Sequence, residues 1–216
     1  MSRTPSSVLE FRGLPVPYIT PWSTEVMTVP SLTLRPGPRG PRLGYVDELH
    51  DRDAGGALYV RQAHAPGRGV PDFRAVHALR HRRACTDLLC QVCRRDLLAT
   101  SPDRQLYLLR DVGDLREGEL VTTPPICPPC AIESTKLCPR LRGGAAAAWV
   151  EQPQLWGVAG IMCDPITLEI EQAPEDAPAA RISYEDPLLD WIIATQVVTK
   201  LVGVTPVDLA DLSTLT

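Results

Sequence analysis

The chain has 216 residues, of which 44% are hydrophobic and 22% charged, so it is long and apolar enough to bury a core. Its 22 prolines, about twice the usual share, disfavour one large regular sheet and favour short elements joined by stiff segments. The net charge is −4 and is unevenly distributed. Residues 164–216 contain ten acidic and two basic residues, a net charge of −8, so the first 163 residues carry +4. These two regions either contact each other or bind different partners.

The sequence shows no targeting or membrane segment. The first residues, MSRTPSSVLEFRG, lack the apolar core of a signal peptide. The longest apolar run, 188–204, contains Asp190 and Lys200 and is too short to span a bilayer comfortably. We therefore expect a cytoplasmic protein without a membrane partner. In that reducing compartment, clustered cysteines are more often metal ligands than disulfides.

The first third of the chain predicts irregular structure followed by a helix. Residues 1–41 are rich in Pro, Ser, Thr and Gly and predict an extended arm that runs into a stiff linker at 35–42. Two strand-like runs with turn residues between them predict a hairpin near 42–63. Helical spacing of apolar residues begins at Phe73, with Asp72 as the candidate N-cap.

The rest of the chain predicts alternating short strands and helices. Residues 104–111 and LVTT predict two strands with an elaborated loop at 111–120 between them, and a helix follows Cys127, because proline suits a first helical turn. AAAAWVEQ and LWGVAGIMC predict two further short strands, and the final apolar run predicts a helix. The expected fold is α+β, with an N-terminal arm at 1–41, a zinc-centred domain at 42–163, an acidic connector at 164–187, and a C-terminal helix and tail at 188–216.

Six of the seven cysteines lie in two clusters. Cys90-x-x-Cys93 and Cys127-x-x-Cys130 form two hooks separated by 33 residues, and each hook suits half of a tetrahedral zinc site. A hook, a hairpin and a second hook at a helix N-terminus make the treble-clef arrangement, in which the helix dipole favours the thiolates. The sequence therefore predicts a structural Zn²⁺ held by these four cysteines.

Cys85 and Cys138 flank the two hooks and allow two interpretations. Free cysteine is among the most buried residue types, so both can be core thiols. The alternative is a second metal site that adds His77 and His81, because His77, His81 and Cys85 are spaced four residues apart and share one face of the expected helix. Cys163 lies inside an apolar run and is expected in the core.

Catalysis finds little support in the sequence. The treble clef is also the frame of the His-Asn-His nucleases, which need a histidine on the hairpin and a metal ligand on the following helix. All four histidines, at 50, 64, 77 and 81, precede the first hook. HDRD at 50–53 could bind a divalent ion, but a solvated turn explains it more simply. A metal-dependent hydrolase or nuclease-like enzyme with a degenerate treble-clef frame is kept as the alternative.

Five arginines surround the first hook: Arg80, Arg82, Arg83, Arg94 and Arg95. They could hold the phosphates of a nucleic acid through bidentate contacts. A solvated helix face, or docking against the acidic end of the chain, explains the same charges. The sequence thus favours a non-enzymatic, zinc-binding interaction module whose partner is a nucleic acid or a protein, and it leaves the oligomeric state open.

The segments HRRACTDLLCQVC and PPICPPCAIESTKLCPRL, together with PVPYITPWS nearer the N-terminus, resemble a group of uncharacterised proteins from high-GC actinobacteria and their phages. The resemblance covers much of residues 14–163. It implies an actinobacterial or phage source and a zinc site. It implies no activity and assigns no functional residue.

Overall fold

The structure is a computed structural model that describes residues 8–110, 115–171 and 178–212. Outside the described residues lie the first seven residues of the predicted arm, part of the predicted loop at 111–120, part of the connector at 164–187 and the last four residues of the tail. The fold is mixed α+β, as predicted, and consists mostly of strands with few helices.

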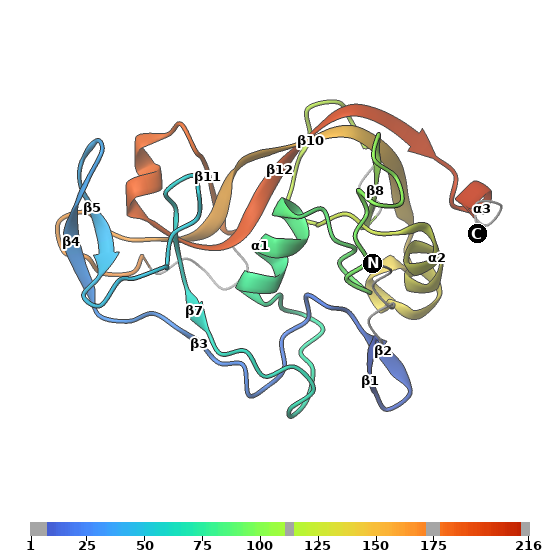
Figure 1. The fold of residues 1–216 in the computed structure, drawn as a ribbon, viewed down its shortest axis with the longest axis horizontal. Helices are drawn as coiled ribbons and strands as arrows, with labels where there is room; N and C mark the ends of the chain where they lie inside the picture. The colour runs from blue at the N-terminus through green and yellow to red at the C-terminus, as the bar shows by residue number, and fades with distance from the viewer. Residues whose placement is uncertain (1–7, 111–114, 172–177, 213–216) are drawn as a thin grey trace.

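Two long antiparallel strands form the frame of the molecule. β10 (Ala145–Met162) and β12 (Ile192–Val207) pair with each other almost from end to end. Figure 1 shows that this pair, the β10–β12 ribbon, arches over the molecule and connects its two ends. β12 is rich in Val, Ile and Thr, whose branched side chains fit a pleated strand. The other elements are arranged along this ribbon.

Two glycines allow β10 to bend within the ribbon. The register of the β10–β12 pairing shifts at Gly157 and again at Gly160, and such bulges bend a strand and increase its twist. A Cβ on Gly157 would lie 2.0 Å from the carbonyl oxygen of Ile182, and one on Gly160 would lie 2.1 Å from that of Ile193. Only glycine fits where the neighbouring backbones approach so closely.

The ribbon is the centre of a six-stranded sheet. β11 (Ala180–Ser183) pairs with β10, and β6 (Leu58–Tyr59) pairs with β12 in the parallel direction. β8 (Gln105–Arg110) pairs with the first half of β10, whereas β9 (Leu120–Val121) pairs with β12. The stretch between the two cysteine hooks is therefore fastened to both strands of the ribbon.

The prediction of a hairpin near 42–63 is wrong, because the strands in this range pair with other parts of the chain. The hairpin in this region is formed by β4 (Leu32–Gly37) and β5 (Gly40–Tyr45), so the predicted linker at 35–42 forms its turn and the adjoining ends of both strands. Proline fixes the extended backbone in each strand, and Gly40, the first residue after the turn at 38–39, takes a φ of 122°. The remaining short strands are β1 (Leu9–Phe11), paired with β2 (Leu14–Val16), and β3 (Met27–Thr28), paired with β7 (Arg61–Gln62).

The helices are short. α1 (Ala78–Thr86) packs against β12 at the centre of the molecule and begins later than predicted, because His77 and not Asp72 caps it by accepting from the Arg80 backbone N–H. α2 (Pro128–Leu137) begins directly after Cys127, as predicted. The other helical turns are η1 (Pro139–Leu141), η2 (Pro187–Trp191) and α3 (Leu209–Leu212).

The prediction that the apolar run within 188–216 forms a C-terminal helix is wrong. The apolar run begins with the single 3-10 turn η2 and continues as β12, and the two short strands expected at AAAAWVEQ and LWGVAGIMC are one strand, β10. The pattern of a short apolar run is compatible with a buried strand as well as with a buried helix. Residues 192–207 form a strand because they pair with β10. In the part of the chain that the structure describes, no helix has the length and apolar character needed to cross a bilayer.

Three hydrophobic clusters lie along the ribbon. The first, around Tyr45 and Ile193, fills the end that holds β4, β5 and η2, and the second, around Leu106 and Trp149, fills the end that holds α2. The third, around Tyr107 and Leu201, alternates with the second along β8 and β10 and therefore lies on the opposite face of the sheet. The second cluster also contains Cys90, Cys127 and Cys130, so the predicted metal ligands belong to a core.

We expect Gly160→Ala to lower the free energy of unfolding by about 1 to 3 kcal/mol, because the new Cβ must displace the β12 backbone. Urea unfolding followed by circular dichroism measures the effect. The matched control is Gly143→Ala, since a Cβ on Gly143 meets no atom within 4 Å. Equal stability of the two variants would contradict the tight bulge.

Candidate metal centre

The first hook is a tight turn closed by backbone hydrogen bonds. The Arg94 N–H donates to the Cys90 carbonyl over 2.9 Å, and the Cys90 N–H donates to the Arg95 carbonyl over 2.8 Å. Arg94 takes a φ of 61°, which a non-glycine residue adopts only when its surroundings hold it there. The turn thus places Cys90 and Cys93 side by side in a fixed orientation.

The second hook is the first turn of α2. Cys127 is the N-cap residue with extended dihedrals, and prolines occupy the first two helical positions, where the fixed φ suits a helix and the missing N–H groups have no intrahelical partner to lose. The Cys127 backbone N–H donates to the Cys90 sulfur over 3.4 Å. This bond joins the second hook directly to the first.

The structure brings together the four cysteines that the spacing singles out. The sulfur atoms of Cys90, Cys93, Cys127 and Cys130 all lie within 4.8 Å of one another, and all four are free thiols. Cys93 Sγ and Cys127 Sγ are 3.7 Å apart, far beyond the ~2.05 Å of a disulfide bond. Four sulfurs at ~2.3 Å from one tetrahedral ion would be separated by about 3.8 Å. The group could therefore hold a metal ion.

Mutual hydrogen bonding sets the ionisation of the four thiols. A hydrogen bond with the Cys127 thiol is the largest effect that lowers the pKa of Cys93, and the Arg95 backbone N–H lowers it further. The pKa of Cys130 is raised, first by Cys127, because neighbouring thiolates disfavour another negative charge. Four adjacent thiols cannot all ionise alone. A bound cation would remove this conflict, because its charge favours the thiolate form of every ligand.

The segment between the hooks does not form the hairpin that a treble clef predicts. In the described residues β8 and β9 do not pair with each other, because β10 takes β8 and β12 takes β9. One antiparallel bridge remains between Leu106 and Ile126, where the Ile126 N–H donates to the Leu106 carbonyl over 2.9 Å. This bridge leads the chain into the second hook.

His77, His81, Cys85 and Cys138 do not form a group of potential ligands within the described residues. His81 Nε2 contacts the Thr122 carbonyl and its Nδ1 accepts from the Val197 N–H, so both ring nitrogens are used. Burial lowers the pKa of His81 to about 4 and raises the pKa of Cys85 to about 12. Cys138 lies at the C-terminal end of α2.

A second group of potential ligands does exist, formed by Glu25, His64 and His77. Its carboxylate is already occupied, because two guanidinium nitrogens of Arg80 donate to the Glu25 oxygens at 2.6 Å each. The backbone N–H groups of Trp22 and Ala65 donate to the same carboxylate. The arginine thus takes the place that a cation would need.

The arginines predicted to contact nucleic acid are placed differently from one another. Arg80 is only 2% exposed and paired with Glu25, so its assignment to a nucleic-acid surface is wrong. The Arg82 guanidinium stacks over the Tyr59 ring. Arg83, Arg94 and Arg95 are exposed, and Arg94 lies over the Tyr18 ring.

The acid–histidine group at 50–53 is also satisfied internally. Asp51 is paired with Arg61, and Arg52 is paired with Glu48. The Asp53 carboxylate accepts from the Ala57 backbone N–H and from the Tyr184 hydroxyl. These contacts agree with a structured turn.

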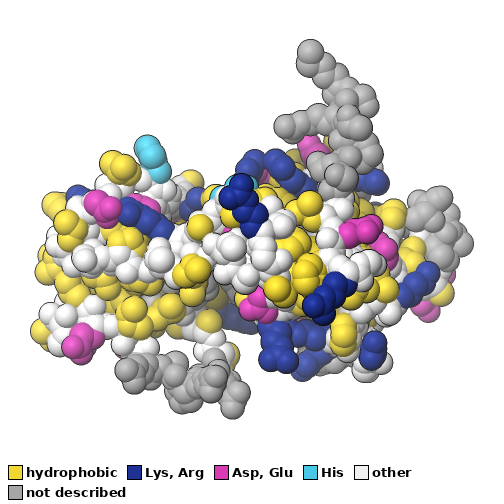
Figure 2. All heavy atoms as spheres, turned by 90° about the horizontal axis from the view of Figure 1, so that it is seen from below, with side chains coloured by type: hydrophobic (Ala, Val, Ile, Leu, Met, Phe, Trp, Pro, Cys, Tyr) yellow, Lys and Arg dark blue, Asp and Glu magenta, His cyan; other side chains and the backbone are white. Residues whose placement is uncertain are grey.

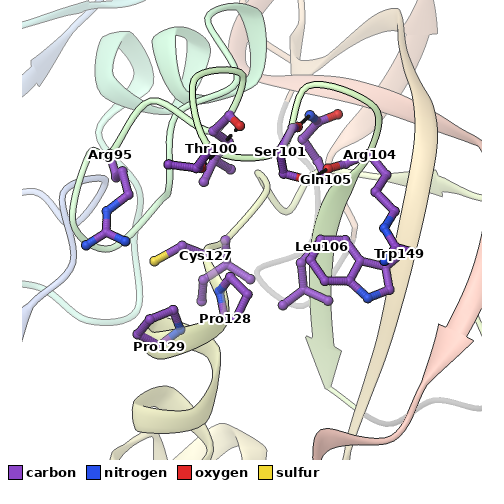
Figure 3. A pocket seen from close by; sticks show the side chains of 12 residues that line it. Arg95, Thr100, Ser101, Arg104, Gln105, Leu106, Cys127, Pro128, Pro129 and Trp149 are labelled. Atoms are coloured by element: carbon purple, nitrogen blue, oxygen red, sulfur yellow. Dashed lines mark hydrogen bonds between the residues drawn. The ribbon is translucent and has the colours of Figure 1, made fainter. Parts of the chain in front are cut away.

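A cavity of about 380 Å³ lies against the second hook (Figure 3). Arg95 and the Thr100–Gln105 loop line one side, and Cys127 with the two prolines after it lines the other. Arg104 and Trp149 complete the wall, with the Arg104 guanidinium carbon 4.6 Å from the centre of a Trp149 ring. Sequence reasoning missed Arg104 and Trp149, because only the pairing of β8 with β10 brings them together.

Comparison with protein-family models, with curated proteins and with solved structures finds no match to this chain. The geometry of the site therefore carries the functional argument by itself.

We expect Glu25→Gln to lower the free energy of unfolding by about 3 to 5 kcal/mol near neutral pH, because it leaves the buried Arg80 charge unpaired. Burial by itself would raise the pKa of Glu25, but hydrogen bonds from Arg80 and two backbone N–H groups lower it from 4.5 to about 2. The wild-type ion pair therefore stabilises the fold above about pH 4.5 and is lost as the pH falls towards 2.

Urea titrations of both proteins at several pH values test this expectation. The difference in free energy of unfolding between wild type and Glu25→Gln should become smaller as the pH falls from 4.5 towards 2. Any metal released by acid affects both proteins alike. Glu133→Gln, at an exposed site on α2, is the control. A difference that does not change with pH would contradict the role of the Glu25 charge.

Proposed function

We propose that the chain is a zinc-stabilised interaction module that carries out no chemistry at its metal. The convergence of four sulfur atoms from two separate segments carries the proposal. Four thiolates in tetrahedral arrangement are typical of Zn²⁺ or of iron–sulfur chemistry, and the 3.7 Å separation of Cys93 Sγ and Cys127 Sγ fits a single zinc ion. A complete thiolate shell leaves no open position for a water or a substrate.

The placement of the centre supports a structural role. Cys90, Cys127 and Cys130 are buried in the hydrophobic cluster around Trp149. Among the described residues between the hooks, β8 and β9 are the regular elements, and the others are irregular. A metal that joins the two hooks would stabilise what this small core cannot stabilise alone. A reducing cytoplasm would keep the thiols available for the metal.

We describe the centre as treble-clef-like. A knuckle at the first hook and a helix that begins at the second hook support this description. The hairpin between them is reduced to the Leu106–Ile126 bridge, since the ribbon takes up β8 and β9. We call the two hooks, β8, β9 and α2 together the metal lobe. In this arrangement the metal lobe is attached to the larger sheet through β8 and β9 and does not form a separate finger.

The surface around the centre supports a binding role. Figure 2 shows that most Lys and Arg side chains on the face seen from below lie over the half of the molecule that holds α2. Arg83, Arg94 and Arg95 are exposed, and Arg94 and Arg95 directly follow the first hook in the sequence. The enzyme alternative gains no comparable support, because the groups around Glu25 and Asp51 are closed by Arg80 and Arg61.

Elemental analysis of the purified full-length protein tests the proposal. We expect one zinc per chain, and we expect Cys127→Ser to lose the metal and to melt the metal lobe, because structural zinc supplies folding free energy directly. Cys138→Ser is the matched control, since Cys138 lies outside the group of four. It should keep both the zinc and the thermal transition.

Two results would overturn the structural role. One is a wild-type protein that folds fully with no metal bound and does not respond to a chelator. The other is a Cys127→Ser protein whose metal content and melting curve match those of Cys138→Ser.

A further inference from the structure

The cavity beside the second hook is lined by two arginine side chains. Arg95 and Arg104 both line it, and neither forms an ion pair with any carboxylate of the described residues. Figure 3 shows Arg95 on one side of the cavity and Arg104 on the other, beside Trp149. Unpaired guanidinium groups at a concave site favour an anionic ligand.

The other polar side chains of the cavity donate hydrogen bonds within the protein. The Thr100 hydroxyl donates to backbone carbonyls, and the Ser101 hydroxyl donates to the Arg104 carbonyl. The Gln105 amide donates to the Ser101 carbonyl over 2.8 Å. The two prolines at the start of α2 have no N–H group to offer. The guanidinium groups are thus the main free donors, so the ligand must present acceptors to them.

The rest of the wall selects the shape of the ligand. Leu97, Leu106 and Ile126 line the apolar floor with almost fully buried side chains, and the Arg104 guanidinium lies over the indole of Trp149, which is 9% exposed. A flat group with two apolar faces would cover this surface. A carboxylate side chain of an acidic peptide would leave it uncovered. The cavity volume of about 380 Å³ is within the range of small-ligand sites.

We propose that this cavity binds one unpaired base of a single-stranded nucleic acid and that Arg95 and Arg104 hold the two phosphates on either side of that base. Bases stack on aromatic and guanidinium planes without strict sequence preference, and a single strand can turn a base into a cavity, whereas a duplex keeps its bases stacked inside. This proposal rests on the proposed function, because a zinc-bound Cys127 would hold one wall of the cavity in place.

The charge of the metal centre limits the electrostatic part of this binding. A zinc ion with four thiolates carries a formal charge of −2, which two guanidinium groups balance without excess. Binding should therefore depend on stacking and on few phosphate contacts. We expect a shallow salt dependence, with a slope of about −1.4 in log K against log salt for two phosphates of a single strand.

Fluorescence anisotropy with labelled twelve-nucleotide oligo(dT) and oligo(U) tests the proposal on the zinc-loaded full chain. We expect wild type to bind single strands, and Arg104→Gln to weaken binding about tenfold through the loss of stacking. Arg95→Gln should make the salt slope shallower by about 0.7, the value for one phosphate. Arg74→Gln removes an equally exposed charge outside the cavity and should leave binding within about twofold of wild type.

Three outcomes would overturn the proposal. The first is equal affinity for a duplex of the same sequence, and the second is equal competition by polyglutamate, which would assign the site to acidic peptides. The third is equal weakening by Arg74→Gln and Arg104→Gln. Zinc content is measured on the same samples. A zinc-loaded protein that binds no oligonucleotide overturns this inference alone, whereas a folded protein without zinc overturns the proposed function.

Discussion

The pairing of β10 with β12 is the constraint on which the path of the chain between the two cysteine hooks depends. The cysteine hooks are separated by a stretch that has little regular structure of its own. That stretch gains a fixed path because β8 adds to one strand of the ribbon and β9 adds to the other. The Leu106–Ile126 bridge then fixes where the second hook begins relative to β8. Direct hydrogen bonds then join the two hooks, from the Cys127 N–H to the Cys90 sulfur and from the Gln91 N–H to the Pro125 carbonyl.

The sequence predicts those features that depend on neighbouring residues. Each Cys-x-x-Cys hook and the helix after Cys127 are local, since a tight turn and an initial proline need only a few residues. Other predictions from local sequence patterns failed where pairing between distant strands determined the secondary structure. The apolar run after Pro187 was expected to be a helix, but its branched residues meet β10 along almost the full strand.

Contacts between distant residues could not be predicted from spacing. Arg80 belongs to an arginine-rich stretch that resembles a charged surface, yet its guanidinium meets a carboxylate 55 residues away in the buried core. His77 and His81 share a helix with Cys85, but backbone carbonyls and N–H groups satisfy their ring nitrogens. The stacking of Arg104 on Trp149 likewise depends on the β8–β10 register. The charge pattern and the helical periodicity of the sequence do not indicate which residues these side chains contact.

The position of β12 in the chain has a consequence for the order of assembly. β12 follows every other described strand in the sequence, yet it lies at the centre of the sheet between β10 and β6. Both hooks leave the ribosome well before it does, so the thiols can capture an ion while the sheet still lacks its middle. Contacts of such long sequence separation form slowly and leave strand edges open in the meantime. Early metal capture would hold the nascent segments together until translation supplies the strand that completes the sheet.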